Sequence, residues 1–153
     1  MENKIQSLLE REGLELASLK ARFLAYVLDY FLVSFLFLFL VWDFVAGVQG
    51  DIAESTQIFL QFSPLYILCN LSYEVIFIHF YGATLGKILF KVRVVSVDYV
   101  DNPSFLISLV RAILKLIGSN FFYITYIFAF DDAFKRTLHD RLAKTIVIST
   151  THA

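Results

Sequence analysis

The chain has 153 residues, of which 58% are hydrophobic and 18% are charged, and its formal net charge is -1 at pH 7. A soluble domain of this length is closer to half apolar and one quarter charged, so the composition indicates an integral membrane protein of one domain. The balanced charge leaves no basic surface and predicts no nucleic-acid partner. Cys69 is the only cysteine, which excludes an intrachain disulfide and a structural zinc site.

Residues 1–20 form a polar arm in which Ile and Leu side chains make a patchy helical stripe. The arm mixes acidic with basic residues, unlike the positively charged start of a secretory signal. We therefore expect a cytoplasmic amphipathic arm that lies along the inner surface of the membrane. A helix that binds a partner protein is the alternative.

Apolar stretches at about 21–44, 58–81 and 104–130 follow within a membrane domain that spans 21–150. The first two stretches are long enough to cross the bilayer, because about 20 apolar residues span its hydrocarbon core as a helix. The loop 46–57 contains no Lys or Arg, whereas the arm, the segment after residue 81 and the tail contain several. Basic loops stay in the cytoplasm, so this distribution predicts a multi-pass protein of the cell (inner) membrane with both termini cytoplasmic.

The third stretch is interrupted by Gly118, Ser119 and Asn120. We predict a hairpin that turns at these residues and returns to the cytoplasmic side. A full crossing is the alternative, although it would place the basic tail outside the cell.

The remaining segments are a tail and two short runs of β-branched residues. The tail is predicted to be helical over 131–144, and the runs Lys91–Val97 and Thr145–Ser149 are predicted to pair as strands. Either run alone would leave its backbone groups unpaired. The predicted fold class is therefore an all-α membrane protein with two transmembrane helices, a third hydrophobic hairpin or transmembrane helix, and a small cytoplasmic β-pair.

Four charged residues lie within the apolar stretches, and such residues are costly in a membrane unless they have partners. They are Asp29, Glu74, Arg111 and Lys115. Counted at 1.5 Å per residue, the first three share a depth of roughly 10 Å below the inner surface. The cluster is either a buried structural charge network or a site for an ion, a proton or an anionic ligand.

The sequence from Gly82 to Lys87 superficially resembles a phosphate-binding loop. Three residues separate Gly82 from Gly86, and Ile88 follows the lysine, whereas a phosphate-binding loop needs four residues and a Ser or Thr. Close packing of the two glycines at the end of a helix is the better interpretation. No other spacing provides a nucleophile with a base, or a set of metal ligands, so we predict no cofactor, no metal and no enzymatic activity.

The chain resembles the RDD family of small membrane proteins from Ala21 to Ile148. ARFLAYVLD matches the arginine and aspartate of the first membrane helix, as Arg22 and Asp29, and RTLHDRLAKT matches the closing block, with Asp140 as the second aspartate. GATLGKILFKVRVVS and VRAILK resemble the two blocks between them. Lys144 stands where a glycine is usual, and Glu74 lies outside the family pattern.

The resemblance implies transport, in some members cation–proton exchange, and in others an accessory role. We therefore expect transport or ion handling through the charge cluster, in the lipid bilayer and in a homo-oligomer or a larger membrane complex. The alternative is a membrane assembly or scaffold subunit without transport activity. We also expect Arg22 to bind Asp140 with two parallel hydrogen bonds and so attach the tail to the first membrane helix.

Overall fold

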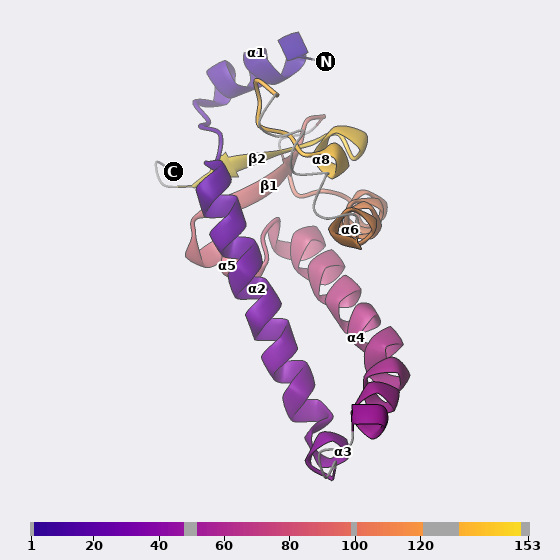
Figure 1. Ribbon diagram of the computed structural model, residues 1–153. Helices are drawn as coiled ribbons and strands as arrows, with labels where there is room; N and C mark the ends of the chain where they lie inside the picture. Colours follow the sequence, from indigo (N-terminus) through magenta and orange to yellow (C-terminus); the bar gives the residue numbers. More distant parts are fainter. Residues whose placement is uncertain (1, 48–51, 99–100, 121–131, 151–153) are drawn as a thin grey trace.

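The computed structural model describes residues 2–47, 52–98, 101–120 and 132–150. Figure 1 shows two long helices that extend from a compact end formed by the shorter elements. The elements run in the order α1 (Glu2–Glu12), α2 (Leu19–Leu40), α3 (Trp42–Ala46), α4 (Ile52–Tyr81), α5 (Leu85–Leu89), β1 (Val92–Ser96), α6 (Phe105–Asn120), α8 (Leu138–Leu142) and β2 (Thr145–Ser149).

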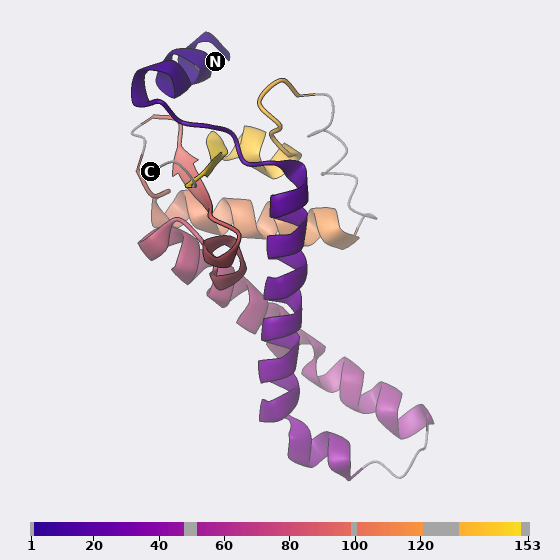
Figure 2. The same cartoon turned by 90° about the vertical axis from the view of Figure 1, so that its left-hand side faces the viewer.

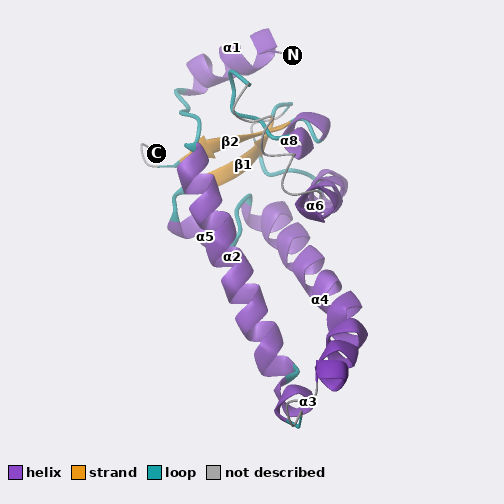
Figure 3. Ribbon diagram, in the orientation of Figure 1, coloured by secondary structure: helices purple, strands orange, loops and turns teal. Residues whose placement is uncertain are grey.

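The predicted β-pair is present at the compact end (Figure 3). β1 and β2 are antiparallel, with Val92 opposite Ser149 and Ser96 opposite Thr145. Valine and isoleucine favour strands because their branched side chains pack well on a pleated surface. This part of the predicted fold class is confirmed.

The N-terminal arm packs against the sheet. Ile5 and Leu8 of α1 join one hydrophobic core with Val95, Ile146 and other residues of the two strands. After α1 the chain forms a bridge from Leu16 to Ile148 and so extends the edge of β2. The apolar stripe of the arm therefore has a partner within the chain, which the sequence pattern alone did not reveal.

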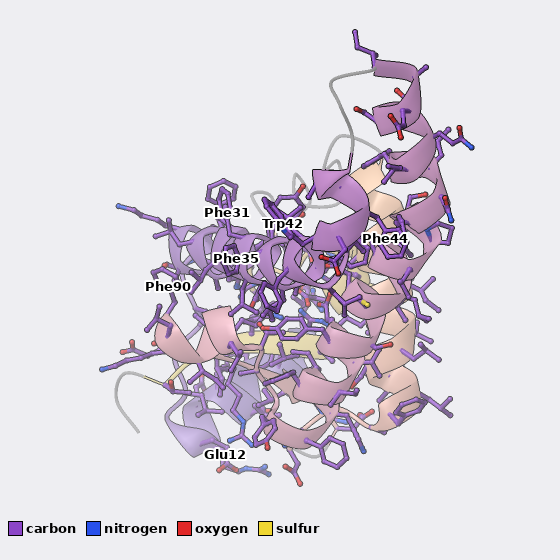
Figure 4. The ribbon with its side chains drawn as sticks, turned by 90° about the horizontal axis from the view of Figure 1, so that it is seen from below. Glu12, Phe31, Phe35, Trp42, Phe44 and Phe90 are labelled. Atoms are coloured by element: carbon purple, nitrogen blue, oxygen red, sulfur yellow. The ribbon has the colours of Figure 1, made fainter. Side chains whose placement is uncertain are left out.

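α2 begins at Leu19, after Ser18, whose hydroxyl accepts a hydrogen bond from the backbone N–H of Ala21 at 3.1 Å. Its outer face is apolar and exposed: Phe31 is 65% and Phe35 71% exposed, and Figure 4 shows Phe31 projecting outward from the ribbon. Within the described residues, α2 is the one helix long and apolar enough to cross a membrane. The second crossing, at 58–81, stays a prediction.

α6 lies across α2 instead of running along it (Figures 1 and 2). The predicted turn at Gly118–Asn120 is wrong in position, because α6 continues through all three residues. One glycine costs a helix only about 1 kcal/mol, which packing readily offsets. The second half of the predicted hairpin, 121–130, lies outside the described residues.

The predicted tail helix over 131–144 is too long, because α8 covers only Leu138–Leu142. Thr137 and Asp140 form a capping box, in which the side chain of each residue accepts a hydrogen bond from the backbone N–H of the other. This reciprocal cap fixes the start of a helix at the residue after the threonine. The tail therefore reaches β2 after a single turn or so of helix.

Candidate functional site

Asp29 faces neutral donors from two other segments. Its carboxylate accepts hydrogen bonds from the Tyr73 hydroxyl at 2.7 Å, the Thr84 hydroxyl at 2.5 Å and the Gly86 backbone N–H at 2.8 Å. Asp29 is 7% exposed. These contacts join α2 to α4 and to the start of α5, where a carboxylate also satisfies an otherwise unpaired backbone donor.

The two glycines predicted to pack closely have different roles. A Cβ atom on Gly86 would lie 2.3 Å from the carbonyl oxygen of Ala25, so Gly86 allows α5 to lie directly on α2. Gly82 ends α4 with φ +68°, a conformation that only glycine adopts without cost. A Cβ there would collide with Asn102, so Gly82 packs against a loop and not against another helix.

Asp140 is the centre of a second, fully buried group of charges. Its carboxylate lies 2.8 Å from Arg111 and 3.6 Å from Arg22, and it accepts a hydrogen bond from the Thr137 hydroxyl at 2.8 Å. Burial raises the pKa of Asp140, but the positive charges of Arg111 and Arg22 outweigh burial and hold the pKa well below its usual range. The carboxylate therefore stays ionised and joins α6, α2 and the tail.

The predicted pair of parallel hydrogen bonds from Arg22 to Asp140 is not formed. Arg22 donates to the carbonyl oxygens of Lys135 at 2.6 Å and Val147 at 3.0 Å. Arg111, coming from α6, is the closer partner of the carboxylate. Arg22 nevertheless connects α2 to the tail, because both of these carbonyls belong to the C-terminal part of the chain.

His139 lies beside Asp140 and is 3% exposed. Burial is the main influence on the ring and lowers its pKa to about 3, so the imidazole is neutral at physiological pH. Among the described residues, no group of three or more His, Cys, Asp or Glu side chains is arranged to hold a metal ion.

Glu74 and Lys115 pair directly, with 2.8 Å between Oε2 and Nζ. The Lys115 ammonium also lies 5.0 Å from the centre of the Tyr26 ring. The pair faces a cavity of about 130 Å³ between α2, α4 and α6. Polar groups in its wall come from Tyr26, Asp29, Tyr30, Tyr66, Asn70, Tyr73, Glu74, Thr84 and Lys115.

The predicted four-residue cluster is thus divided between two places. Asp29, Glu74 and Lys115 line the cavity, while Arg111 turns toward Asp140 and donates to the Thr145 hydroxyl at 3.2 Å. The division follows from the orientation of α6. Because α6 lies across α2, residues one helical turn apart on it reach different neighbours.

Lys87 is a further functional candidate. Its sequence context indicates only that residues 82–87 do not form a phosphate-binding loop. Lys87 is 7% exposed, and its ammonium has no hydrogen-bond partner among the described residues. Burial, followed by the positive charge of Arg111, lowers the pKa of Lys87 to about 7. A buried lysine of this kind changes its charge near physiological pH, which is typical of functional sites.

Sequence reasoning also missed the donors that surround the two aspartates. The pattern Thr137-x-x-Asp140 is a visible capping-box signal and would have located the start of α8. No comparable signal links Asp29 to Tyr73 or Thr84, which are 44 and 55 residues away. Those contacts depend on how the helices pack.

Comparison with known proteins agrees with this arrangement. The sequence profile of the RDD family matches residues 16–144, most of the chain. No curated protein and no solved structure matches the chain. The match includes Arg22, Asp29 and Asp140, each of which is buried and joins segments distant in sequence. The chain belongs to the RDD family of membrane proteins.

Proposed function

We propose that this membrane protein binds and moves a small cation or a proton through the cavity between α2, α4 and α6. The observation that carries the proposal is the cavity itself, because Asp29, Glu74 and Lys115 reach it from three different helices. Charged side chains on apolar helices are expensive and usually mark the path of an ion or a proton.

Asp29 is the residue best placed to take up the ion. Its three hydrogen-bond partners are two hydroxyls and a backbone N–H, so none of them offsets its negative charge. A cation or a proton can therefore be bound there without breaking a salt bridge. Glu74 is instead already neutralised by Lys115.

We further propose two crossings, with both termini in the cytoplasm of a cell with an inner membrane. α1 and β2, the first and last elements, lie at the same end of the long helices (Figure 1), which supports this topology. Two crossings are too few to enclose a polar path alone. We therefore propose a homo-oligomer or a larger membrane complex as the working form.

A role as an assembly subunit, without transport, is the second candidate. The tight burial of Asp140 with Arg111 and Arg22 favours it, because these contacts join α2, α6 and the tail into one rigid unit. A rigid surface of this kind suits a scaffold. In that case the partner would co-purify in a fixed ratio and no flux would be measured.

Flux in proteoliposomes tests the first proposal. The full chain should exchange protons for Na⁺ or K⁺, and Asp29→Asn should abolish the exchange because it removes the carboxylate that is proposed to bind the cation. Asp43→Asn is a matched control, since Asp43 is exposed on α3 and does not line the cavity. Equal flux in the parent and Asp29→Asn proteins, or no flux in either, would contradict the proposal.

A further inference from the structure

A groove of about 650 Å³ separates the far halves of α2 and α4. Its wall contains aromatic and aliphatic side chains and three serines, and none of its lining residues is charged. This volume lies within the range of ligand sites, which are mostly apolar with a few polar groups.

The groove adjoins the polar cavity, and Tyr66, which lines both spaces, shares a hydrogen bond of 2.8 Å with Ser34 of the groove. Tyr30, Tyr66 and Ile67 line both spaces. The cavity holds about 130 Å³, close to the size that admits a group such as benzene. Together the two spaces provide a small polar chamber and, beside it, a longer apolar groove.

The charge in the chamber favours a positive ligand. Asp29 and Glu74 supply two formal negative charges to the lining and Lys115 one positive charge, and the nearby Lys87, whose pKa is about 7, adds a second positive charge only in part at neutral pH. Tyr30, Tyr66 and Tyr73 also line the chamber. Aromatic rings beside a carboxylate are a recurring way to bind quaternary ammonium groups.

We propose that the adjoining cavity and groove bind a single-chain cationic amphiphile, with its ammonium group near Asp29 and its alkyl chain between α2 and α4. The inference rests on the proposed function in one respect, because the ammonium group would occupy the cavity in which Asp29 is proposed to bind a small cation. The chamber accounts for the charge and the size of the head group. The groove accounts for the apolar chain.

Binding of radiolabelled decyltrimethylammonium to the full chain in lipid nanodiscs tests the inference. A scintillation-proximity readout detects ligand held by the protein, and empty nanodiscs give the background. Unlabelled decyltrimethylammonium should compete at least tenfold better than butyltrimethylammonium, which lacks the long chain. Decyl sulfate, which has the same chain and the opposite charge, should not compete.

Two substitutions locate the ligand within the site. Ser63→Trp fills the groove and should weaken binding at least tenfold, whereas Leu60→Trp, on the same helix but outside the groove, should leave binding unchanged. Asp29→Asn should also weaken binding at least tenfold, with Asp43→Asn as its control. A thermal melt of each variant verifies that it is folded. If Asp29→Asn is unfolded, Ser63→Trp still tests the proposed site.

Several outcomes would overturn the inference. Equal competition by decyl sulfate would exclude charge recognition, and equal effects of Ser63→Trp and Leu60→Trp would exclude the groove. A Ser63→Cys, Cys69→Ser protein can be tested for disulfide crosslinking between two copies. Crosslinking that persists in the presence of decyltrimethylammonium would mean that a second copy fills the groove. Amphiphile binding without proton-coupled flux would support the ligand site and refute the proposed transport. Na⁺ flux without amphiphile binding would support transport and refute the ligand site.

Discussion

Asp140→Ala should destabilise the protein severely. Asp140 is 1% exposed at its side chain and Arg111 is 4% exposed, and their charged atoms are 2.8 Å apart. Removing one partner of a buried ion pair costs about 3–5 kcal/mol, because the remaining charge is left buried and uncompensated. Here Arg111 and Arg22 would both lose their counter-charge. A chain of this length loses roughly 2–4 °C of Tm per kcal/mol, so the expected fall in Tm is roughly 10 °C.

Thermal unfolding in mild detergent, followed by circular dichroism, measures this effect. Asp98→Ala is the matched control, since it removes an aspartate whose ion pair with Lys4 is exposed to solvent. It should leave Tm almost unchanged, because solvent screens exposed pairs. Asp140→Asn keeps the side-chain shape and should still lower Tm strongly.

The same network predicts that mutations will not add. Arg22→Ala combined with Asp140→Ala should be no worse than Asp140→Ala alone, because removing Arg22 also removes one unpaired buried charge. Protease accessibility of the tail in inside-out vesicles should follow the same order. Fully additive losses, or an effect of Asp140→Ala no larger than that of Asp98→Ala, would refute the reasoning.

Four further predictions address packing, backbone conformation, pH and topology. Gly86→Ala should lower Tm by several degrees, because its Cβ would lie 2.3 Å from a backbone oxygen of α2 and force α5 away. Lys144→Gly should raise the free energy of unfolding by about 0.5 kcal/mol, because φ at Lys144 is +50°. The steric cost of this left-handed conformation for lysine exceeds the extra conformational entropy that glycine loses on folding. The pKa of Lys87 falls from 10.5 to about 7 on folding, so the unfolded chain binds the extra proton between these values and stability should rise with pH across them. Lys87→Met should remove that rise and increase Tm most at pH 7 and below. Reporters fused to either terminus should report the cytoplasm, while one inserted in 46–57 should report the outside.

Each of these predictions has a control or a contradicting result. Gly47→Ala is the control for the first, because a Cβ there meets its neighbours at 3.8 Å, an ordinary contact. A fall in Tm for Lys144→Gly would mean that the left-handed backbone costs nothing there. An unchanged pH slope in Lys87→Met would show that another group titrates. A C-terminal reporter found outside would mean that 104–130 crosses completely.

Lys144 shows how a backbone conformation set by the fold can oppose the preference of the residue that adopts it. Lys144 takes a left-handed conformation directly before β2. A glycine would adopt this conformation freely, whereas it is costly for lysine.

The sequence by itself determined the parts of this protein that depend on short-range patterns. A continuous apolar run specifies α2, and two β-branched runs specify the sheet, because each signal is complete within one segment. Asp29 could also be identified from the chain, since a charge within an apolar stretch stands out, whereas Arg22 and Asp140 were identified through the resemblance to the RDD family. The residues that these side chains contact could not be identified from the sequence.

Only the tertiary structure decided which charges meet. Counting residues along a helix gives the depth of a side chain in the membrane. Equal depth predicts contact between two side chains only where their helices run side by side. α6 lies across α2 (Figure 2), so Arg111 and Lys115 diverge, one toward Asp140 and the other toward Glu74. Asp29 receives hydroxyl and amide donors because Gly86 lets α5 approach α2 closely. Crossing angle and close approach are properties of packed helices, and no single segment encodes them.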